Sequence, residues 1–164
     1  MDFEISGNAA LVTASSSGLG KASATALARE GVDVVINGRD EERLATAREE
    51  VRAEAADGAE VVAERADLTD ADDIGRLVET TVEEFGGVDH LVTSAGGPKP
   101  LSTLETTDED WYHAFDLLTM SVVRVVREAA PHLRADDGGT IVTITSRTTK
   151  EARSTNVLSS SVRM

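Results

Sequence analysis

The sequence is poor in the residues that build disulfides, thiolate metal sites and membrane spans. Among 164 residues there is no cysteine, three prolines, one tryptophan and one tyrosine. Without cysteine, a disulfide framework and a thiolate metal site are excluded. No apolar run approaches the ~18 residues of a membrane span, and the first residues lack the basic and apolar regions of a signal peptide. We therefore expect a cytoplasmic protein with no membrane partner.

Basic residues are also scarce. Lysine and arginine total 16 against 30 aspartates and glutamates, which gives a formal net charge of −14. This balance argues against nucleic acid as a partner. Two interpretations stay open: an ordinary solvated surface, or a salt-adapted (halophilic) protein whose carboxylates keep it in solution at high ionic strength. The histidines, at positions 90, 113 and 132, lack the spacing of metal ligands, so no metal site is expected.

Short apolar runs alternate with amphipathic stretches along the chain. The runs predict strands at 9–13, 32–36, 61–63, 89–93 and 140–144. The stretches between them predict helices at 18–30 and 40–55, a third that ends at 86–87, a long one after 107 and a last one near 157. This alternation predicts an α/β fold, a doubly wound parallel sheet of Rossmann type in three layers, with helices covering both faces. We expect one domain over residues 1–164.

Polar residues mark where the helices begin. Thr69 with Asp72, and Thr107 with Asp110, resemble capping boxes, and Asp40 is expected to be the N-cap of the second helix. After Thr107 we expect one long helix, which carries Trp111, Phe115, Leu118, Val122, Val125, Ala129 and Leu133. Its valines and leucines also offer a dimer seam, so we expect a homo-oligomer of the full-length protein.

Residues 13–20, with the sequence TASSSGLG, join the first predicted strand to the first helix. A buried strand that runs through such a turn into a helix binds the pyrophosphate of a dinucleotide, because orphan N–H groups and the positive helix end face the anion. Gly18 and Gly20 let the backbone come close to phosphate and let the helix pack on the strand. The chain is therefore expected to be a Rossmann-type dinucleotide-binding domain.

Four segments, in this order and spacing, resemble the short-chain dehydrogenase/reductase (SDR) family over nearly the whole chain. They are residues 13–20, ADLTD at 66–70, TSAG at 93–96 and ITS at 144–146. The resemblance, loosely to the 3-oxoacyl carrier-protein reductase-like branch, implies an NAD(P)-dependent oxidoreductase that acts on a carbonyl or secondary alcohol. The expected cofactor-binding residues are Thr13, Ser15, Ser16, Ser17, Gly18, Leu19, Gly20, Arg39, Asp67, Leu68, Ser94, Ala95 and Gly96.

The end of the second strand favours NADP, although NAD is not excluded. An NAD-specific unit places an acid about 20 residues past the glycines, on the ribose 2′-hydroxyl. Here Asn37, Gly38 and Arg39 come first, and no acid follows until Asp40. A guanidinium at this point can pair with a 2′-phosphate in bidentate fashion, whereas a plain surface charge would look the same. Asp67 either accepts the adenine amino group or belongs to ordinary loop chemistry.

The catalytic pattern of the family is only partly present. Its serine matches Ser146, but its Tyr-x-x-x-Lys falls on Ser159 and Arg163 and its helix asparagine on Leu118. If chemistry occurs, we expect Ser146 to hold the carbonyl and Arg163 to supply positive charge. The proton donor stays open between Ser159, Lys150 and a water, and Ser159 and Arg163 can equally be the first turn of a helix.

Two further features separate this chain from the family pattern. Ala14 replaces the first glycine of the turn, and if the position needs a positive φ the methyl group costs on the order of 1 kcal/mol and weakens cofactor binding. The basic residues Arg147, Lys150 and Arg153 follow Ser146 in an otherwise acidic chain. They either attract an anionic substrate or form a solvated loop.

Two hypotheses of different classes follow. The first is an NADP-preferring oxidoreductase. The alternative is a catalytically degenerate or truncated nucleotide-binding protein without dehydrogenase activity, which the loss of the tyrosine and lysine favours. The resemblance implies further strands and a substrate loop beyond Met164, so we expect a fragment, incomplete at its C-terminus and inactive by itself.

Overall fold

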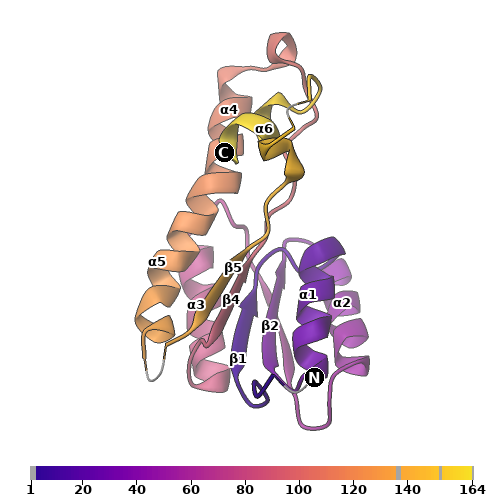
Figure 1. Cartoon of the computed structure of the whole chain (residues 1–164), viewed down its shortest axis with the longest axis vertical. Coiled ribbons are helices and arrows are strands. Elements are labelled where there is room, and N and C mark those ends of the chain that lie inside the picture. The colour runs from indigo at the N-terminus through magenta and orange to yellow at the C-terminus, as the bar shows by residue number, and fades with distance from the viewer. Residues whose placement is uncertain (1–2, 136–137, 152, 164) are drawn as a thin grey trace.

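The computed structural model describes residues 3–135, 138–151 and 153–163. Within them, the strands form one parallel sheet of order β3-β2-β1-β4-β5, whose arrows all point the same way in Figure 1. The strands are β1 (Ala9–Val12), β2 (Asp33–Gly38), β3 (Val61–Arg65), β4 (His90–Thr93) and β5 (Thr140–Thr143). The strand order reverses between β1 and β4, which makes the carboxyl end of β1 the switch point where ligands bind.

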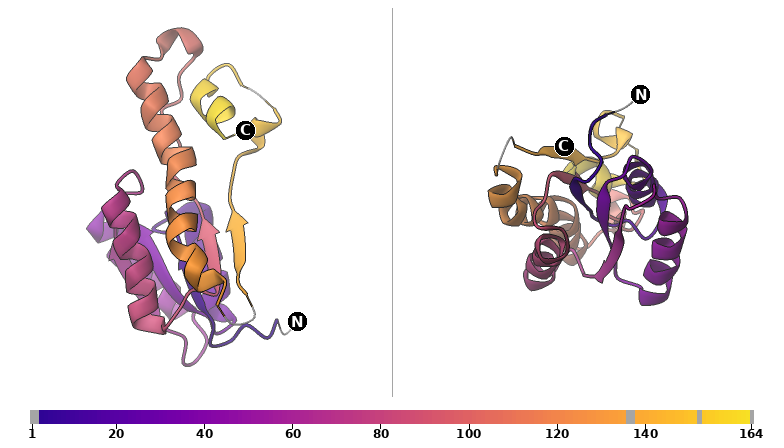
Figure 2. Two further views of the ribbon diagram at one scale, coloured as in Figure 1. Left: turned by 90° about the vertical axis from the view of Figure 1, so that its left-hand side faces the viewer. Right: turned by 90° about the horizontal axis from the view of Figure 1, so that it is seen from below.

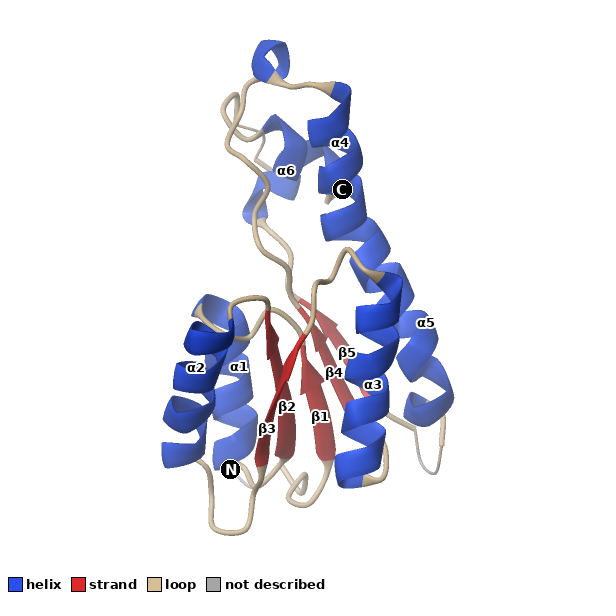
Figure 3. Cartoon of the chain, turned by 180° about the vertical axis from the view of Figure 1, so that it is seen from behind, coloured by secondary structure: helices blue, strands red, loops and turns tan. Residues whose placement is uncertain are grey.

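Helices cover the two faces of the sheet, as Figure 3 and the view from below in Figure 2 show. They are α1 (Gly18–Arg29), α2 (Glu41–Ala53), α3 (Ala71–Phe85), α4 (Asp108–Phe115), α5 (Ser121–Leu133) and α6 (Val157–Val162). Helices α1 and α2 pack on one face, and α3 and α5 on the other. The predicted doubly wound, three-layer α/β fold is confirmed. Helices α4 and α6 lie beyond the carboxyl ends of the strands (Figure 1).

Strand β1 shows how the sequence divides its side chains between the two cores. Ala10 and Val12 enter the core beneath α1 and α2, whereas Leu11 enters the core beneath α3 and α5. All four residues of β1 are buried, and each pairs with β2 on one side. Burial on both faces explains why this strand reads as a continuous apolar run. The turn that follows it therefore starts from a fixed position.

The helix caps confirm two predictions and correct one. Asp40 accepts a hydrogen bond from the Arg43 N–H at 2.8 Å and caps α2, and Thr107 begins α4 in a reciprocal box with Asp110. The prediction of Thr69 as the cap of α3 is wrong, because Asp70 is the cap and accepts from the N–H groups of Asp72 and Asp73. Thr69 instead donates its N–H and hydroxyl to an upstream carboxylate.

The long helix predicted after Thr107 is interrupted. A π-helical segment, Asp116–Met120, lies between α4 and α5. A π turn inserts an extra residue into the helical repeat, so the apolar positions before and after it lose their common phase. Phe115 is 51% exposed, while Ala114 beside it is buried. After the interruption the apolar pattern holds, because Val125, Ala129 and Leu133 pack with the α3 side chains.

Strand β5 differs from the other four. Strand β3 extends two residues past its predicted end, to Arg65, whereas β5 ends at Thr143 and each of its residues is exposed. Its apolar side chains, Ile141 and Val142, are 47% and 55% exposed. The predicted cover on both faces therefore fails at this edge of the sheet within the described residues. No helix among them is both long and apolar enough to cross a membrane.

Candidate functional site

The loop between β1 and α1 is held by two buried hydroxyl side chains. Thr13 donates its hydroxyl to the Ser94 carbonyl at 2.7 Å and accepts from the Ser94 N–H at 2.8 Å. Ser15 donates its hydroxyl to the Val12 carbonyl at 2.6 Å and accepts from the Asn37 N–H at 2.8 Å. Because Thr13 and Ser15 are 2% and 0% exposed, these side chains brace the loop and do not line the cleft beside it.

Ala14 has a φ of 48°, so the position does require the left-handed backbone that the family glycine suggested. The Ala14 N–H donates to the side-chain oxygen of Asn37 at 2.9 Å, and the Asn37 amide nitrogen donates to the Ala66 carbonyl at 3.0 Å. Asn37 thus connects the β1–α1 and β3–α3 loops to the end of β2. This role was not predicted, although a polar residue at the end of an apolar strand was an available signal.

The start of α1 is shaped to receive an anion. A Cβ at Gly20 would lie 2.5 Å from the Ala14 carbonyl oxygen, and Gly18 has a φ of 59°, so both positions depend on glycine. Ser17 is the N-cap residue, but its side chain makes no capping hydrogen bond. Its hydroxyl and the first N–H groups of α1 therefore remain available for a bound phosphate.

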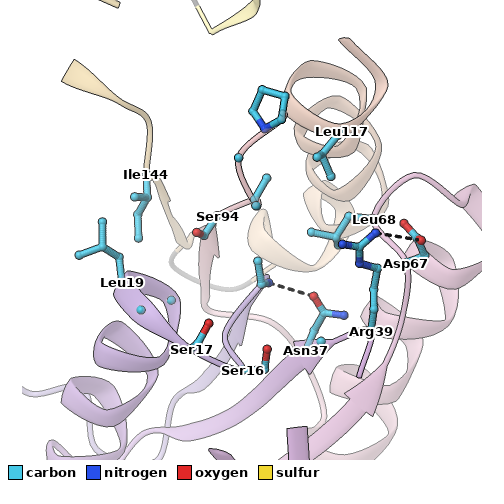
Figure 4. A pocket seen from close by; sticks show the side chains of 18 of the residues that line it. Ser16, Ser17, Leu19, Asn37, Arg39, Asp67, Leu68, Ser94, Leu117 and Ile144 are labelled. Atoms are coloured by element: carbon cyan, nitrogen blue, oxygen red, sulfur yellow. Dashed lines mark hydrogen bonds and ion pairs between the residues drawn. The ribbon is translucent and has the colours of Figure 1, made fainter. Parts of the chain in front are cut away.

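A cleft of about 1050 Å³ opens over this turn, at the carboxyl ends of the strands. Figure 4 shows Arg39 and Asp67 on one side of it and Leu19 and Ile144 on the other. The cleft brings together these expected site residues: Ser16, Ser17, Gly18, Leu19, Gly20, Arg39, Asp67, Leu68, Ser94, Ala95, Gly96, Ser146, Ser159 and Arg163. It also contains lining residues that the sequence did not single out as binding residues: Ala14, Asn37, Gly38, Asp40, Arg43, Ala66, Gly97, Pro98, Lys99, His113, Leu117, Ile144 and Thr145.

One end of the cleft holds a facing cation and anion. The Arg39 guanidinium lies 3.7 Å from the Asp67 carboxylate, as the dashed line in Figure 4 marks. Partial burial alone would raise the pKa of Asp67, but hydrogen bonds from Thr69 and the charge of Arg39 lower it below its ordinary value. Arg43, one turn into α2, lines the same cleft. This end therefore offers two guanidinium groups and one ionised carboxylate to a ligand.

Space beside Arg39 is set by Gly38. A Cβ at that position would lie 2.8 Å from the Cβ of Ser16, so the β1–α1 loop packs directly on the end of β2. Gly38 itself carries no carboxylate, whereas an NAD-specific site places an acidic residue near the end of this strand.

Ser146 is oriented at the other end of the cleft. Its hydroxyl oxygen accepts hydrogen bonds from the Thr148 N–H at 3.3 Å and from the Thr148 hydroxyl at 2.9 Å. With its oxygen engaged as an acceptor, Ser146 keeps its own hydrogen to donate into the cleft. Thr148 is itself buried, at 9% exposure. No pattern in the sequence indicated this positioning role.

Arg163 enters the cleft from the end of α6. Its Nη2 donates to the Gly96 carbonyl at 3.4 Å, while its Nε is inaccessible and has no hydrogen-bond partner. Burial lowers its pKa below the ordinary value. Ser159 also lines the cleft, whereas Lys150 does not.

Tyrosine is absent from the cleft. Tyr112, the single tyrosine of the chain, is 74% exposed on α4 and is not among the lining residues. Leu118 lines a second cavity of about 610 Å³ between the π segment, α4, α6 and the ends of β4 and β5. Among the described residues, no three histidine, aspartate or glutamate side chains gather as metal ligands would.

A parallel doubly wound sheet with a cleft at its switch point, above a glycine-containing turn into a helix, defines a nucleotide-binding α/β protein. The family model described as short chain dehydrogenase matches residues 8–161. The chain therefore belongs to the short-chain dehydrogenase family.

Individual relatives agree with this assignment. The chain is 36% identical over 138 residues to a 3-oxoacyl-[acyl-carrier-protein] reductase of Synechocystis, covering 84% of this chain and 55% of that protein. It resembles an L-sorbose reductase of Gluconobacter frateurii complexed with NADPH and L-sorbose, with a TM-score of 0.93, 32% identity, and coverage of 99% and 61%.

A third match is a short chain oxidoreductase of Pseudomonas aeruginosa, an NADPH-bound structure containing an atypical catalytic center. It has a TM-score of 0.89 and 31% identity, over 96% of this chain and 62% of that one. The chain spans about half the length of the curated relatives it matches. Structural neighbours with bound NADPH support a nicotinamide cofactor for this fold.

Proposed function

We propose that the protein is an NAD(P)-dependent oxidoreductase of short-chain dehydrogenase type, with a preference for NADP, acting on a carbonyl or secondary alcohol. The observation that carries the proposal is one continuous cleft that joins the anion-receiving start of α1 to Ser146. Its size suits a dinucleotide, and Gly20 and Gly38 occupy positions where a Cβ would clash with the β1–α1 loop beneath it. The nicotinamide supplies or accepts a hydride when it is bound.

The cofactor roles follow from where each residue lies. Ser16, Ser17 and the start of α1, residues 18–20, bind the pyrophosphate, and Thr13 and Ser15 keep the loop in place through their buried hydroxyls. Ser94, Ala95 and Gly96 lie against the ribose, and Leu68 lies beside the adenine, whose amino group donates to the Asp67 carboxylate.

NADP preference rests on Arg39 and its neighbour Arg43. Both line the cleft at the end where the adenosine would lie, and a guanidinium pairs well with a phosphate dianion. Asp40, the first acid after the strand, already accepts the Arg43 N–H as the cap of α2. It is therefore less suited than a free carboxylate to hold a 2′-hydroxyl.

At the reacting end, Ser146 donates its hydroxyl hydrogen to the carbonyl oxygen of the substrate, and Arg163 stabilises negative charge that develops on that oxygen. An always-charged guanidinium does not relay a proton, so the proton comes from Ser159 or from a water beside it. A serine hydroxyl is a weak acid, which predicts slow turnover.

The absence of tyrosine from the cleft favours a second function. In this alternative the protein binds the dinucleotide but does not oxidise or reduce a substrate. Both functions predict that NADPH protects the chain from thermal unfolding. Only the first predicts that the longer gene product consumes NADPH with some member of a panel of ketones. Lack of protection by millimolar NADPH and NADH, at salt concentrations where the chain is folded, would contradict both.

A further inference from the structure

Arg163 is a partly buried cation without a compensating anion. Two other cations of the cleft have acidic neighbours: Arg39 lies 3.7 Å from Asp67, and Lys99 lies 3.1 Å from Asp110. The remaining one, Arg43, is exposed to solvent. Within the described part of the chain, Arg163 forms no ion pair, and its Nε lacks a hydrogen-bond partner. Burying a charge without a partner costs free energy. A site that keeps such a charge beside a cleft is suited to an anionic ligand.

The place of Arg163 identifies which part of the ligand it meets. Arg163 also lines the second cavity, together with Thr143, Ile144 and Thr145, the residues that lead directly to Ser146. Neither Arg39 nor Asp67 lines that cavity. The guanidinium therefore lies between Gly96, which is proposed to meet the ribose, and the segment that leads to Ser146. It does not lie at the Arg39 end of the cleft.

A neutral ligand does not compensate the positive charge of Arg163. Ribose hydroxyls and uncharged ketones can accept hydrogen bonds, but they leave the positive charge uncompensated. A carboxylate supplies both the charge and two acceptor oxygens in a plane, which a guanidinium matches in bidentate geometry. Arg147, Lys150 and Arg153 are exposed in the segment after Ser146 and make the approach to this end more positive than the rest of an acidic protein.

Resting on the function proposed above, we propose that the substrate is an oxo acid, or the corresponding hydroxy acid, whose carboxylate pairs with Arg163 while its carbonyl oxygen accepts from Ser146. In the reductive direction, the oxo acid, NADPH and one proton give the hydroxy acid and NADP⁺. The hydride adds to the carbonyl carbon, and the proton adds to the carbonyl oxygen. The carboxylate keeps its charge throughout, so it anchors the substrate without taking part in bond formation.

The test is a calorimetric titration of the 164-residue chain at constant ionic strength, with and without NADPH. The probes are 2-oxobutanoate and 3-oxobutanoate, compared with butanone as an uncharged ligand of similar size. We expect the oxo acids to bind about tenfold more tightly than butanone, or better, since a charge-assisted bidentate pair is worth at least that ratio. Equal affinities for the acids and the ketone would overturn the inference.

Variants then assign the effect to Arg163. Arg163→Gln should remove the advantage of the oxo acids, and Arg163→Lys should retain part of it. Arg52→Gln, which removes a charge from the exposed surface of α2, should leave it unchanged. Thermal unfolding curves establish that each variant is folded. Unaltered oxo-acid binding by folded Arg163→Gln, or a loss confined to NADPH affinity, would show that Arg163 is not the carboxylate site.

The same titrations distinguish this inference from the function on which it rests. If NADPH does not bind but the oxo acids bind through Arg163, the dinucleotide proposal fails and the anion site stands. If NADPH binds and the oxo acids show no preference over butanone, the oxidoreductase proposal stands and the substrate class is wrong.

Discussion

The side-chain oxygen of Asn37 accepts a hydrogen bond from the backbone N–H of Ala14 at 2.9 Å. This contact holds a non-glycine residue at a φ of 48°, in a region that an L-residue enters only at a cost. A Cβ on Gly20 would lie 2.5 Å from the Ala14 carbonyl oxygen. The turn therefore keeps its shape through Asn37, even though its first glycine has been replaced.

Replacing Ala14 with glycine should stabilise the protein. We expect Ala14→Gly to raise the free energy of unfolding by about 1 kcal/mol, because glycine adopts a positive φ without the steric cost of a Cβ. Urea denaturation followed by circular dichroism measures the change. Ala10→Gly, in the buried strand β1, is the matched control and should lower stability. A decrease in stability for Ala14→Gly would show that Ala14 is not strained.

Asn37 should be needed for the same turn. Asn37→Ala removes the acceptor for the Ala14 N–H and the donor to the Ala66 carbonyl. Because Asn37 is buried, we expect a loss of about 2 kcal/mol in the free energy of unfolding, together with weaker NADPH binding. Chemical denaturation and a dinucleotide titration measure the two effects. A variant with wild-type stability and affinity would remove Asn37 from this role.

Arg39 should decide the choice between the two dinucleotides. Arg39→Asp places a carboxylate where the 2′-phosphate is proposed to lie, so we expect the affinity for NADPH to fall relative to that for NADH. Fluorescence titration with each dinucleotide gives the ratio. Arg52→Asp makes the same charge change on the exposed surface of α2 and serves as the control. An unchanged ratio in Arg39→Asp would exclude Arg39 from the binding site.

Asp67 should contribute to stability in a pH-dependent way. Its pKa in the folded protein is lowered, so its contribution is present above the ordinary aspartate pKa of about 3.9 and is lost as the pH falls through the lower folded value. We expect wild type to be more stable than Asp67→Asn at neutral pH, with the difference shrinking in acid. Urea midpoints of both proteins, measured from pH 7 down to the acid limit of folding, provide the comparison. A difference that grows in acid would reverse the sign of this assignment.

Thr148 should position Ser146 through its hydroxyl. Thr148→Val removes the donor at 2.9 Å but keeps the shape of the side chain, and we expect NADPH-dependent ketone reduction by the longer gene product to fall about tenfold. Thr148→Ser restores the hydroxyl and should restore most of the rate. A purely structural role would instead show as equal losses of thermal stability in the two variants, without rescue of the rate by serine.

Much of the fold could be predicted because it follows from local patterns. Apolar runs gave the strands, and the small-residue turn at residues 13–20 located the cleft. A positive φ at Ala14 was considered only as a condition, because the family has glycine at that position, and the structure shows that the condition holds. Asp40 as a cap and the box of Thr107 with Asp110 were predictable because each cap acts on residues within one turn of the chain.

What only the tertiary structure decided depends on residues distant in sequence. Asn37 binds both the β1–α1 loop and the β3–α3 loop because β1 and β3 end on either side of β2. Arg43 lines the cleft because α2 begins at its edge. The error at Thr69 is different, because the Asp67 carboxylate that accepts its N–H and hydroxyl is only two residues away. The π segment shifted a helical face that the sequence pattern treated as continuous. Local preferences determine where the chain forms turns, strands and helices. Packing between these elements decides which polar atoms come into contact, and the chemistry of the site depends on those contacts.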